Sequence, residues 1–170
     1  YYTKLLILRN RILGIEQYII DPEREYTKVC ETLDGVCIKL GPTSNSYINV
    51  LDIREDSIDE EEGYLTTKIG KLRGFFSLVF GELADIYDLG EENIKYGMYI
   101  FTDLFWDKIK KDRNVNKAIY LDEIWRLIGV TSNKNVAAFI YKIFKTIRKY
   151  GGSAVAITQD ISDLFSLEEG

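Results

Sequence analysis

The sequence has no histidine, and cysteine occurs only at Cys30 and Cys37 among its 170 residues. Without histidine, Ser-His-Asp triads and most catalytic zinc sites are excluded. Two cysteines are too few for a disulfide scaffold and would need further ligands to hold a metal, so they fit a reducing compartment. No apolar run approaches the ~18 residues expected of a membrane-spanning helix.

Positive charge is also in the minority, because 22 Lys and Arg residues are outnumbered by 27 Asp and Glu residues, for a net charge of −5. This balance excludes a basic footprint over the whole domain for nucleic acid, although local basic patches stay open. An acidic run over residues 55–62 is interpreted as a solvated loop rather than a metal site. The length allows one α/β domain with its own core.

Apolar periodicity predicts strands that alternate with helices, which is typical of a mainly parallel sheet flanked by helices on both faces. Short apolar runs predict strands at residues 17–20, 36–40, 118–121 and 154–158. Longer patterns predict helices at residues 2–13, 24–33, 65–83, 98–111 and 135–150, the last ended by Gly151 and Gly152.

The spacing within three of these helices also predicts which side chains are buried. The apolar face of the 65–83 helix is predicted to contain Leu65, Ile69, Leu72, Phe76, Val79 and Leu83. In the two later helices the predicted buried residues are Tyr99, Leu104, Phe105, Ile109, Ile143, Phe144 and Ile147, which leaves Arg148 near the surface.

Polar side chains follow three of the predicted strands. They are the Asp21–Glu25 segment, the pair Asp122 and Glu123, and Gln159 after Thr158. Ligands of parallel sheets bind at the carboxyl ends of the strands. We therefore predict Asp122 and Glu123 at the end of a central strand, with Asp21 and Gln159 at the ends of nearby strands.

An apolar strand that ends in Asp-Glu matches the Walker B pattern of P-loop ATPases. The Asp would hold Mg²⁺, which prefers hard oxygen ligands, and the Glu would point to the other face of the extended strand and polarise the attacking water. Such a pair can equally be a charge pair at a helix N-terminus. Gln159 could sense a γ-phosphate or cap a helix over residues 160–165.

Four stretches taken together resemble the CagE/TrbE/VirB family, the VirB-four type ATPases of type IV secretion and conjugative transfer. They are residues 19–26, residues 48–53, Lys117 to Trp125 with its Asp-Glu-Ile-Trp, and Arg148 to Gln159 with its Arg-Lys-Tyr and Thr-Gln. FtsK and HerA pumps share the Asp-Glu and the terminal Gln, but are less similar around Trp125 and Arg148.

The resemblance implies the C-terminal motor domain of such an ATPase: a RecA-like P-loop NTPase core that binds ATP and Mg²⁺ at the interfaces of a hexameric ring. It implies that Asp122 holds Mg²⁺ through water, that Glu123 activates water and that Gln159 senses the γ-phosphate. Arg148 matches an arginine finger, although a cation stabilised by the helix dipole is the simpler interpretation. Asp21, Glu23 and Glu25 match an acidic motif near the nucleotide.

The same resemblance implies a motor subunit that energises type IV secretion or conjugative transfer. Its partners would be copies of itself, the secretion channel with its inner-membrane components, and DNA, and its place the cytoplasmic face of the inner membrane. The alternatives are a DNA-pumping translocase of the FtsK/HerA kind and a non-catalytic scaffold.

Three family features are missing from the chain. It contains no G-x-x-x-x-G-K-[ST] phosphate-binding loop, no helical insertion near residues 84–85 and no final strands. We therefore expect residues 1–170 to be a fragment of a RecA-like domain that is inactive by itself. Its expected parts are the first αβ units (1–54), a helical region (55–116), and the Walker B and sensor region (117–170).

Overall fold

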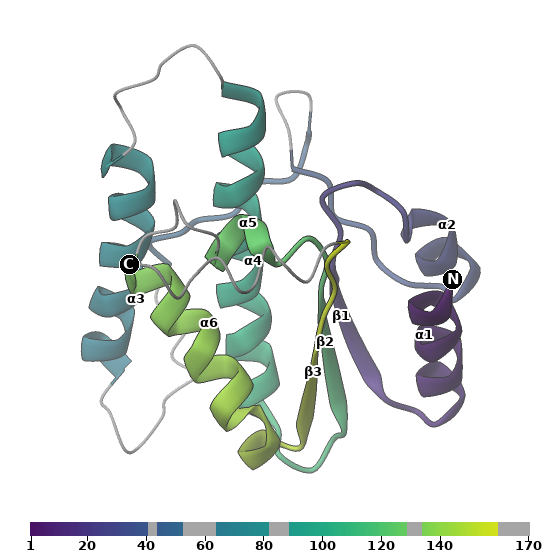
Figure 1. The fold of residues 1–170 in the computed structure, drawn as a ribbon. Helices are drawn as coiled ribbons and strands as arrows, with labels where there is room; N and C mark the ends of the chain where they lie inside the picture. The colour runs from purple at the N-terminus through teal and green to yellow at the C-terminus, as the bar shows by residue number, and fades with distance from the viewer. Residues whose placement is uncertain (41–43, 53–63, 82–88, 129–133, 160–170) are drawn as a thin grey trace.

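The computed structural model describes residues 1–40, 44–52, 64–81, 89–128 and 134–159 (Figure 1). Three parallel strands form one sheet in the order β1-β2-β3, and they span Glu16–Ile20, Lys117–Leu121 and Gly152–Ala156. Lys117 of the central β2 pairs with Glu16 on one side and with Gly152 on the other, so the three strands begin and end level. The predicted parallel sheet is confirmed.

Helices cover both faces of the sheet, as predicted. The helices α1 (Tyr2–Ile12) and α2 (Thr27–Thr32) lie on one face (Figure 1). On the other side of the sheet lie α4 (Leu89–Lys111), α5 (Trp125–Ile128) and α6 (Lys134–Thr146), the last continued by the 3-10 helix η2 (Ile147–Tyr150). Farther from the strands, α3 (Tyr64–Gly81) packs against α4 and α6. Within the described part of the chain, none of these helices is long and apolar enough to cross a membrane.

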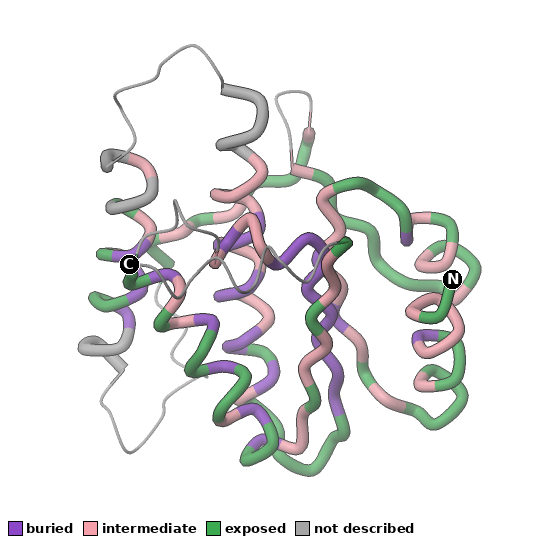
Figure 2. The backbone as a smooth tube through the Cα atoms, viewed as in Figure 1, coloured by how far each residue is buried: buried purple, intermediate pink, exposed green. Residues whose placement is uncertain are grey.

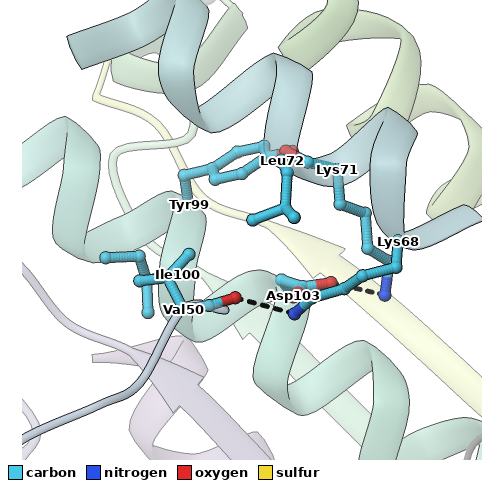
Figure 3. A pocket seen from close by; sticks show the side chains of 7 residues that line it. All are labelled: Val50, Lys68, Lys71, Leu72, Tyr99, Ile100 and Asp103. Carbon is cyan, nitrogen blue, oxygen red and sulfur yellow. Dashed lines mark hydrogen bonds and ion pairs between the residues drawn. The ribbon is translucent and has the colours of Figure 1, made fainter. Parts of the chain in front are cut away.

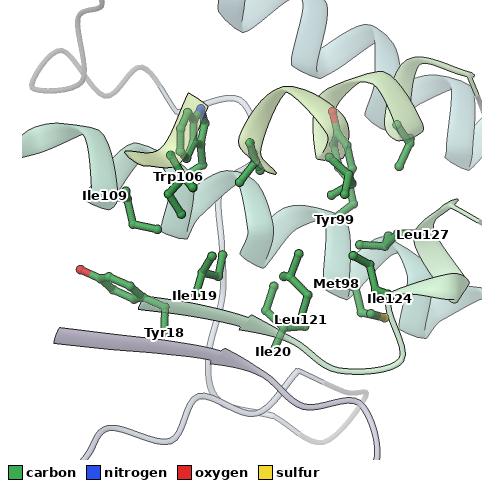
Figure 4. Close-up of a cluster of buried hydrophobic side chains, with 14 of the residues drawn as sticks. Tyr18, Ile20, Met98, Tyr99, Trp106, Ile109, Ile119, Leu121, Ile124 and Leu127 are labelled. Atoms are coloured by element: carbon green, nitrogen blue, oxygen red, sulfur yellow. The ribbon is translucent and has the colours of Figure 1, made fainter. Parts of the chain in front are cut away.

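The core is built around β2, which is buried over its whole length (Figure 2). Because successive side chains of a strand point to opposite faces, Ile119 and Leu121 pack with α4 and α6 in the larger cluster (Figure 4). Ala118 and Tyr120 pack in the smaller cluster toward α1 and α2. Two apolar layers therefore fix β2 between the helices.

A buried tyrosine ties α1 to the sheet on the smaller side. The hydroxyl of Tyr120 accepts a hydrogen bond from the amide of Asn10 at 2.7 Å and donates one to the Gln17 side-chain oxygen at 2.9 Å. The Gln17 amide donates in turn to the Ile7 carbonyl at 3.0 Å. Both polar groups of this buried tyrosine are thus used, and α1 is held in register with β1 and β2.

Four predicted elements differ from the structure. Two differ only in their ends, since α4 begins at Leu89 instead of residue 98, and β3 spans Gly152–Ala156 instead of residues 154–158. The other two differ more. Residues 36–40 form no strand, and Val36 is 86% exposed, because this segment pairs with no other strand among the described residues. The helix predicted from Arg24 begins only at Thr27. Its start is delayed because Arg24 has a left-handed backbone, with φ 60°, and the preceding turn is held by Asp21.

The predicted buried face of α3 is wrong in part, since Ile69 is 57% exposed and Phe76 41% exposed. The helix instead turns Lys68, Lys71 and Gly74 inward. A Cβ atom at Gly74 would lie 2.7 Å from the Tyr99 hydroxyl oxygen, so α4 approaches α3 closely at this glycine. Lys71 is paired with Asp103 and Asp107 of α4, so buried charges take part in this interface beside apolar residues such as Phe75.

Predictions for the later helices are mostly confirmed. Tyr99, Ile109, Ile143 and Ile147 are buried, while Phe144 is 36% exposed and Leu104 and Phe105 are half-buried. The left-handed Gly151, with φ 68°, ends η2 as the sequence predicted. The acidic run 55–62, Leu83, the region of residues 84–85 and the helix expected over 160–165 lie outside the described residues.

Candidate functional site

The carboxyl ends of the three strands meet at one edge of the sheet, and backbone hydrogen bonds continue past them. The Asp122 N–H donates to the Ile20 carbonyl at 3.2 Å, and the Ile157 N–H donates to the Leu121 carbonyl at 3.0 Å. The segments that follow β1, β2 and β3 are thus held side by side. This brings together Asp21, Asp122, Glu123 and Gln159, which we call the strand-end cluster.

Glu123 lies in a turn rather than in the extended strand that the sequence predicted. Its backbone is left-handed, with φ 51°, which is uncommon for a residue other than glycine and costs of order 1–3 kcal/mol. Its N–H donates to the Asp122 Oδ1 atom at 3.1 Å. Both residues are buried, with exposed fractions of 6% for Asp122 and 5% for Glu123. The turn therefore places two carboxylates close together where they are largely buried from solvent.

Both carboxylate oxygens of Glu123 are engaged. Gln159 Nε2 donates to Oε1 at 3.0 Å, so the amide predicted at the end of the neighbouring strand touches the predicted base. The indole N–H of Trp125 donates to Oε2. The sequence did not predict this contact, although Trp125 belongs to the Asp-Glu-Ile-Trp motif. The one feature that could have indicated it is an indole donor two residues after the glutamate.

Burial raises the pKa of Asp122 to about 6, and the negative charges of Glu123, Asp21 and Glu25 act in the same direction. The hydrogen bond from the Glu123 N–H lowers the pKa but does not offset these effects. A carboxyl group surrounded by other carboxylates is stabilised in its charged form by a cation. The electrostatics of the strand-end cluster therefore suit a positively charged ligand.

The carboxylate oxygens of the strand-end cluster suit a Mg²⁺ ion that is also bound by a phosphate compound. Among the described residues, no group of three or more Asp, Glu, Cys or His side chains could hold a metal ion. Mg²⁺ usually keeps several waters and binds only one or two protein carboxylates together with phosphate oxygens. Asp122 alone would meet that requirement.

The acidic residues after β1 are largely engaged with the protein itself. Asp21 accepts hydrogen bonds from the N–H groups of Glu25 at 2.9 Å and Tyr26 at 2.8 Å. Glu23 pairs with Arg126 Nη2 at 2.8 Å, which links the loop after β1 to α5. Glu25 lies 3.8 Å from the Lys4 ammonium group. These side chains shape the edge of the site.

Arg148 does not join the strand-end cluster. It is exposed in η2, which precedes β3, whereas Gln159 follows β3. A strand of five residues spans about 17 Å at ~3.3 Å per residue, so the two side chains lie at opposite edges of the sheet. Arg148 therefore cannot reach the strand-end cluster of its own chain.

A pocket between α3 and α4 is separate from these groups (Figure 3). Lys68 Nζ donates to the Val50 carbonyl at 2.7 Å, and the Tyr99 hydroxyl donates to the Lys71 carbonyl at 2.9 Å. Asp103 also lines it, paired with Lys71. No residue of the strand-end cluster lines this pocket, so it belongs to the packing of two helices.

Comparison with known proteins shows the family to which the chain belongs. The model of the TraG P-loop domain family matches residues 79–168, more than half of the chain. The chain belongs to this family. Asp122, Glu123, Trp125, Arg148 and Gln159 all lie within the matched part of the TraG P-loop domain, whereas the acidic loop after β1 lies outside it.

The fold agrees with this membership. A solved structure titled "Structure of VirB4 of Thermoanaerobacter pseudethanolicus" superposes with a TM-score of 0.69 at 20% sequence identity, covering 93% of this chain and 82% of that one. None of the curated proteins matches the chain. The TraG P-loop domain described here is therefore a P-loop NTPase fold of the VirB4 type, and the family predicted from the sequence is confirmed.

Proposed function

We propose that this TraG-type domain is part of an ATP-hydrolysing motor subunit that energises type IV secretion or conjugative transfer. One observation carries the proposal. Gln159 Nε2 lies 3.0 Å from Glu123 Oε1, although the two residues follow different strands and are far apart in the sequence. Such a pairing of a base with an amide, at the ligand-binding edge of a parallel sheet, suits the hydrolysis of a phosphate compound.

Glu123 acts as the general base in this proposal. Its carboxylate accepts a proton from a water molecule while the water oxygen bonds to the γ-phosphorus and the bond from phosphorus to the bridging oxygen breaks, which leaves ADP. Asp122 would hold Mg²⁺ through water, and the ion would supply positive charge to the phosphate oxygens. Gln159 leaves Glu123 to contact the γ-phosphate, which makes it the sensor of hydrolysis.

The acidic loop after β1 has a supporting role. Asp21 and Glu25 add negative charge beside Asp122, which favours retention of the cation. Glu23 acts by holding the loop to Arg126 of α5 at the same end of the sheet. The division into residues 1–54, 55–116 and 117–170 remains part of this proposal. So do a hexameric ring, contacts with the secretion channel, inner-membrane components and DNA, and a peripheral place on the cytoplasmic face of the membrane.

The test is a Glu123→Gln substitution in the natural full-length protein. We expect ATP to bind with unchanged affinity while hydrolysis falls roughly 10²-fold or more, because the amide cannot take a proton from water. The matched control is Glu31→Gln, an exposed glutamate of α2, which should leave turnover unchanged. A loss of nucleotide affinity with unchanged kcat would instead make Glu123 a binding residue.

The 170-residue chain by itself provides a second test. It contains no G-x-x-x-x-G-K-[ST] loop to cradle the β- and γ-phosphates, so we expect no turnover of ATP by this chain alone. Steady hydrolysis by the purified chain, abolished by Glu123→Gln, would show that the phosphates are bound in another way.

A further inference from the structure

The carboxylate of Glu123 is held by two donors of different character. Gln159 is exposed and follows β3 at the edge of the described sheet. Trp125 is half-buried and is the first residue of α5, directly after the turn that contains Glu123. The amide is thus free to exchange partners, whereas the indole is fixed in the same turn as the residue that it contacts.

The indole ring is itself clamped from the loop after β1. The guanidinium group of Arg126 lies over the Trp125 ring, 5.1 Å from its centroid. The same group is paired with Glu23 Oε1 at 2.8 Å. A chain of contacts therefore runs from Glu23 through Arg126 and Trp125 to Glu123, and it joins the ends of β1 and β2.

We propose that Trp125 is a positioning residue, whose indole N–H holds the Glu123 carboxylate in its reactive orientation after Gln159 has moved to the substrate. This inference rests on the proposed function. An indole nitrogen is a donor only, so it cannot compete with the glutamate for the proton of water. When Gln159 moves away, Glu123 Oε1 is free to accept that proton. The hydrogen bond from Trp125 to Oε2 keeps the Glu123 side chain from rotating.

The left-handed turn explains why such a support is needed. Glu123 has φ 51°, and its N–H donates to the Asp122 side chain, so its backbone belongs to a turn and not to a regular helix or strand. A displacement of about 1 Å in a catalytic group can cost on the order of 10²-fold in rate. The Trp125 contact restrains the one side chain whose position matters most for the reaction.

Trp125→Phe in the full-length protein tests the inference, because it keeps a ring beneath Arg126 and removes only the N–H donor. We expect kcat to fall about 10-fold while KM for ATP changes less than about twofold. The control is Trp106→Phe, a core tryptophan that packs edge-on against Tyr150 and should leave kcat per folded subunit unchanged. In a Glu123→Gln background, Trp125→Phe should lower kcat no further, since its effect passes through Glu123.

Full kcat in Trp125→Phe, or an equal fractional loss in the Glu123→Gln background, would overturn the inference. A second measurement does not depend on activity. In protein labelled with 5-fluorotryptophan, the ¹⁹F resonance that Trp125→Phe removes should shift when Glu123 is changed to Gln, whereas that of Trp106 should not. An unshifted resonance also overturns the inference. Absence of hydrolysis in the wild type would instead overturn the proposed function, and the ¹⁹F shift would still report whether Trp125 contacts Glu123.

Discussion

Carboxylates at the strand ends differ in what their surroundings leave them to do. Asp21 is engaged by two backbone N–H groups of its own loop, and Glu23 by Arg126. Asp122 accepts one hydrogen bond, from the Glu123 N–H, in a buried position where its pKa is raised to about 6. The aspartate after β1 therefore stabilises its own loop, whereas the aspartate after β2 is available to bind a ligand.

Asp21→Ala should destabilise the domain by about 2–4 kcal/mol, because the N–H groups of Glu25 and Tyr26 each lose a charged acceptor. Denaturant unfolding of the chain measures the change. Glu31→Ala, at an exposed position of α2, should change stability by less than about 0.5 kcal/mol. An equally small effect of Asp21→Ala would mean that solvent replaces the carboxylate in this turn.

The two cysteines should differ in their rate of alkylation. Burial raises the pKa of the Cys30 thiol, and the neighbouring Cys37 thiol contributes, so less thiolate is present at Cys30 at a given pH. Cys37 is exposed. We expect iodoacetamide to modify Cys37 first near pH 8, with the difference narrowing as the pH rises above the Cys30 pKa. Mass spectrometry of the digested chain follows both sites, and faster reaction at Cys30 would contradict the prediction.

At the scale of elements, helix α3 packs against α4 with buried charges as well as apolar side chains. Lys71 Nζ lies 2.5 Å from Asp103 Oδ1 and 2.7 Å from Asp107 Oδ1, and all three side chains are buried. Lys110 Nζ adds a contact with Asp107 at 3.5 Å. This cluster fixes the rotation of α3 against α4.

Lys71→Met should therefore cost about 3–5 kcal/mol of folding stability, because it leaves two carboxylates buried with less compensation. Arg73→Met, at an exposed position of the same helix, should be nearly neutral. Adding Asp103→Leu to Lys71→Met should recover part of the loss, since an apolar pair can replace a buried ion pair. Urea unfolding compares the three variants, and no recovery in the double variant would show that the cluster is needed as a whole.

These elements also show how far the sequence alone can go. The strands could be predicted because short apolar runs bounded by turn residues report burial locally, and the ends of parallel strands had to meet at one edge. The inward turn of Lys71 could not be predicted, because its acidic partners lie on another helix. Residues 36–40 look like a strand by composition, but a strand also needs a neighbour, which composition does not reveal.

For the site, Asp122, Glu123 and Gln159 could be placed because each follows a predicted strand. The hydrogen bond from Trp125 to Glu123 could not, because it depends on the left-handed turn at Glu123. No local pattern marks such a turn when the residue is not glycine. The sequence thus predicted which residues form the strand-end cluster, but not the hydrogen bonds that position them.

At the scale of the whole molecule, the two edges of the sheet carry different groups. The strand-end cluster lies at the carboxyl edge, and Arg148 lies beside the amino edge, in η2. An arginine finger at Arg148 can therefore serve only the site of another subunit. The proposed ring, in which each subunit completes the site of its neighbour, requires this placement of Arg148.

Mixed assemblies test this arrangement. Arg148→Ala should lower turnover on the order of 10³-fold in the full-length protein while leaving ATP affinity and folding stability unchanged. Mixing Arg148→Ala subunits with Glu123→Gln subunits should restore part of the activity, because some interfaces then combine an intact arginine with an intact glutamate. Lys149→Ala, the exposed neighbour of Arg148, is the matched control and should keep full activity. Full activity in Arg148→Ala, with no complementation, would leave Arg148 as a helix-end cation.

The left-handed backbone of Glu123 affects how substitutions at this position should be interpreted. With φ at 51°, Gln, Asn and Gly can follow the turn, whereas Val and Ile are strained there. A saturation library scored by survival or transport would group all of these as inactive. A parallel score for soluble expression would separate them, since the β-branched variants should fail by misfolding and the others by lost chemistry. Soluble expression should thus be kept by substitutions at position 123 that are typical of a tight turn, although these variants are inactive. Loss of expression at this position would say nothing about catalysis.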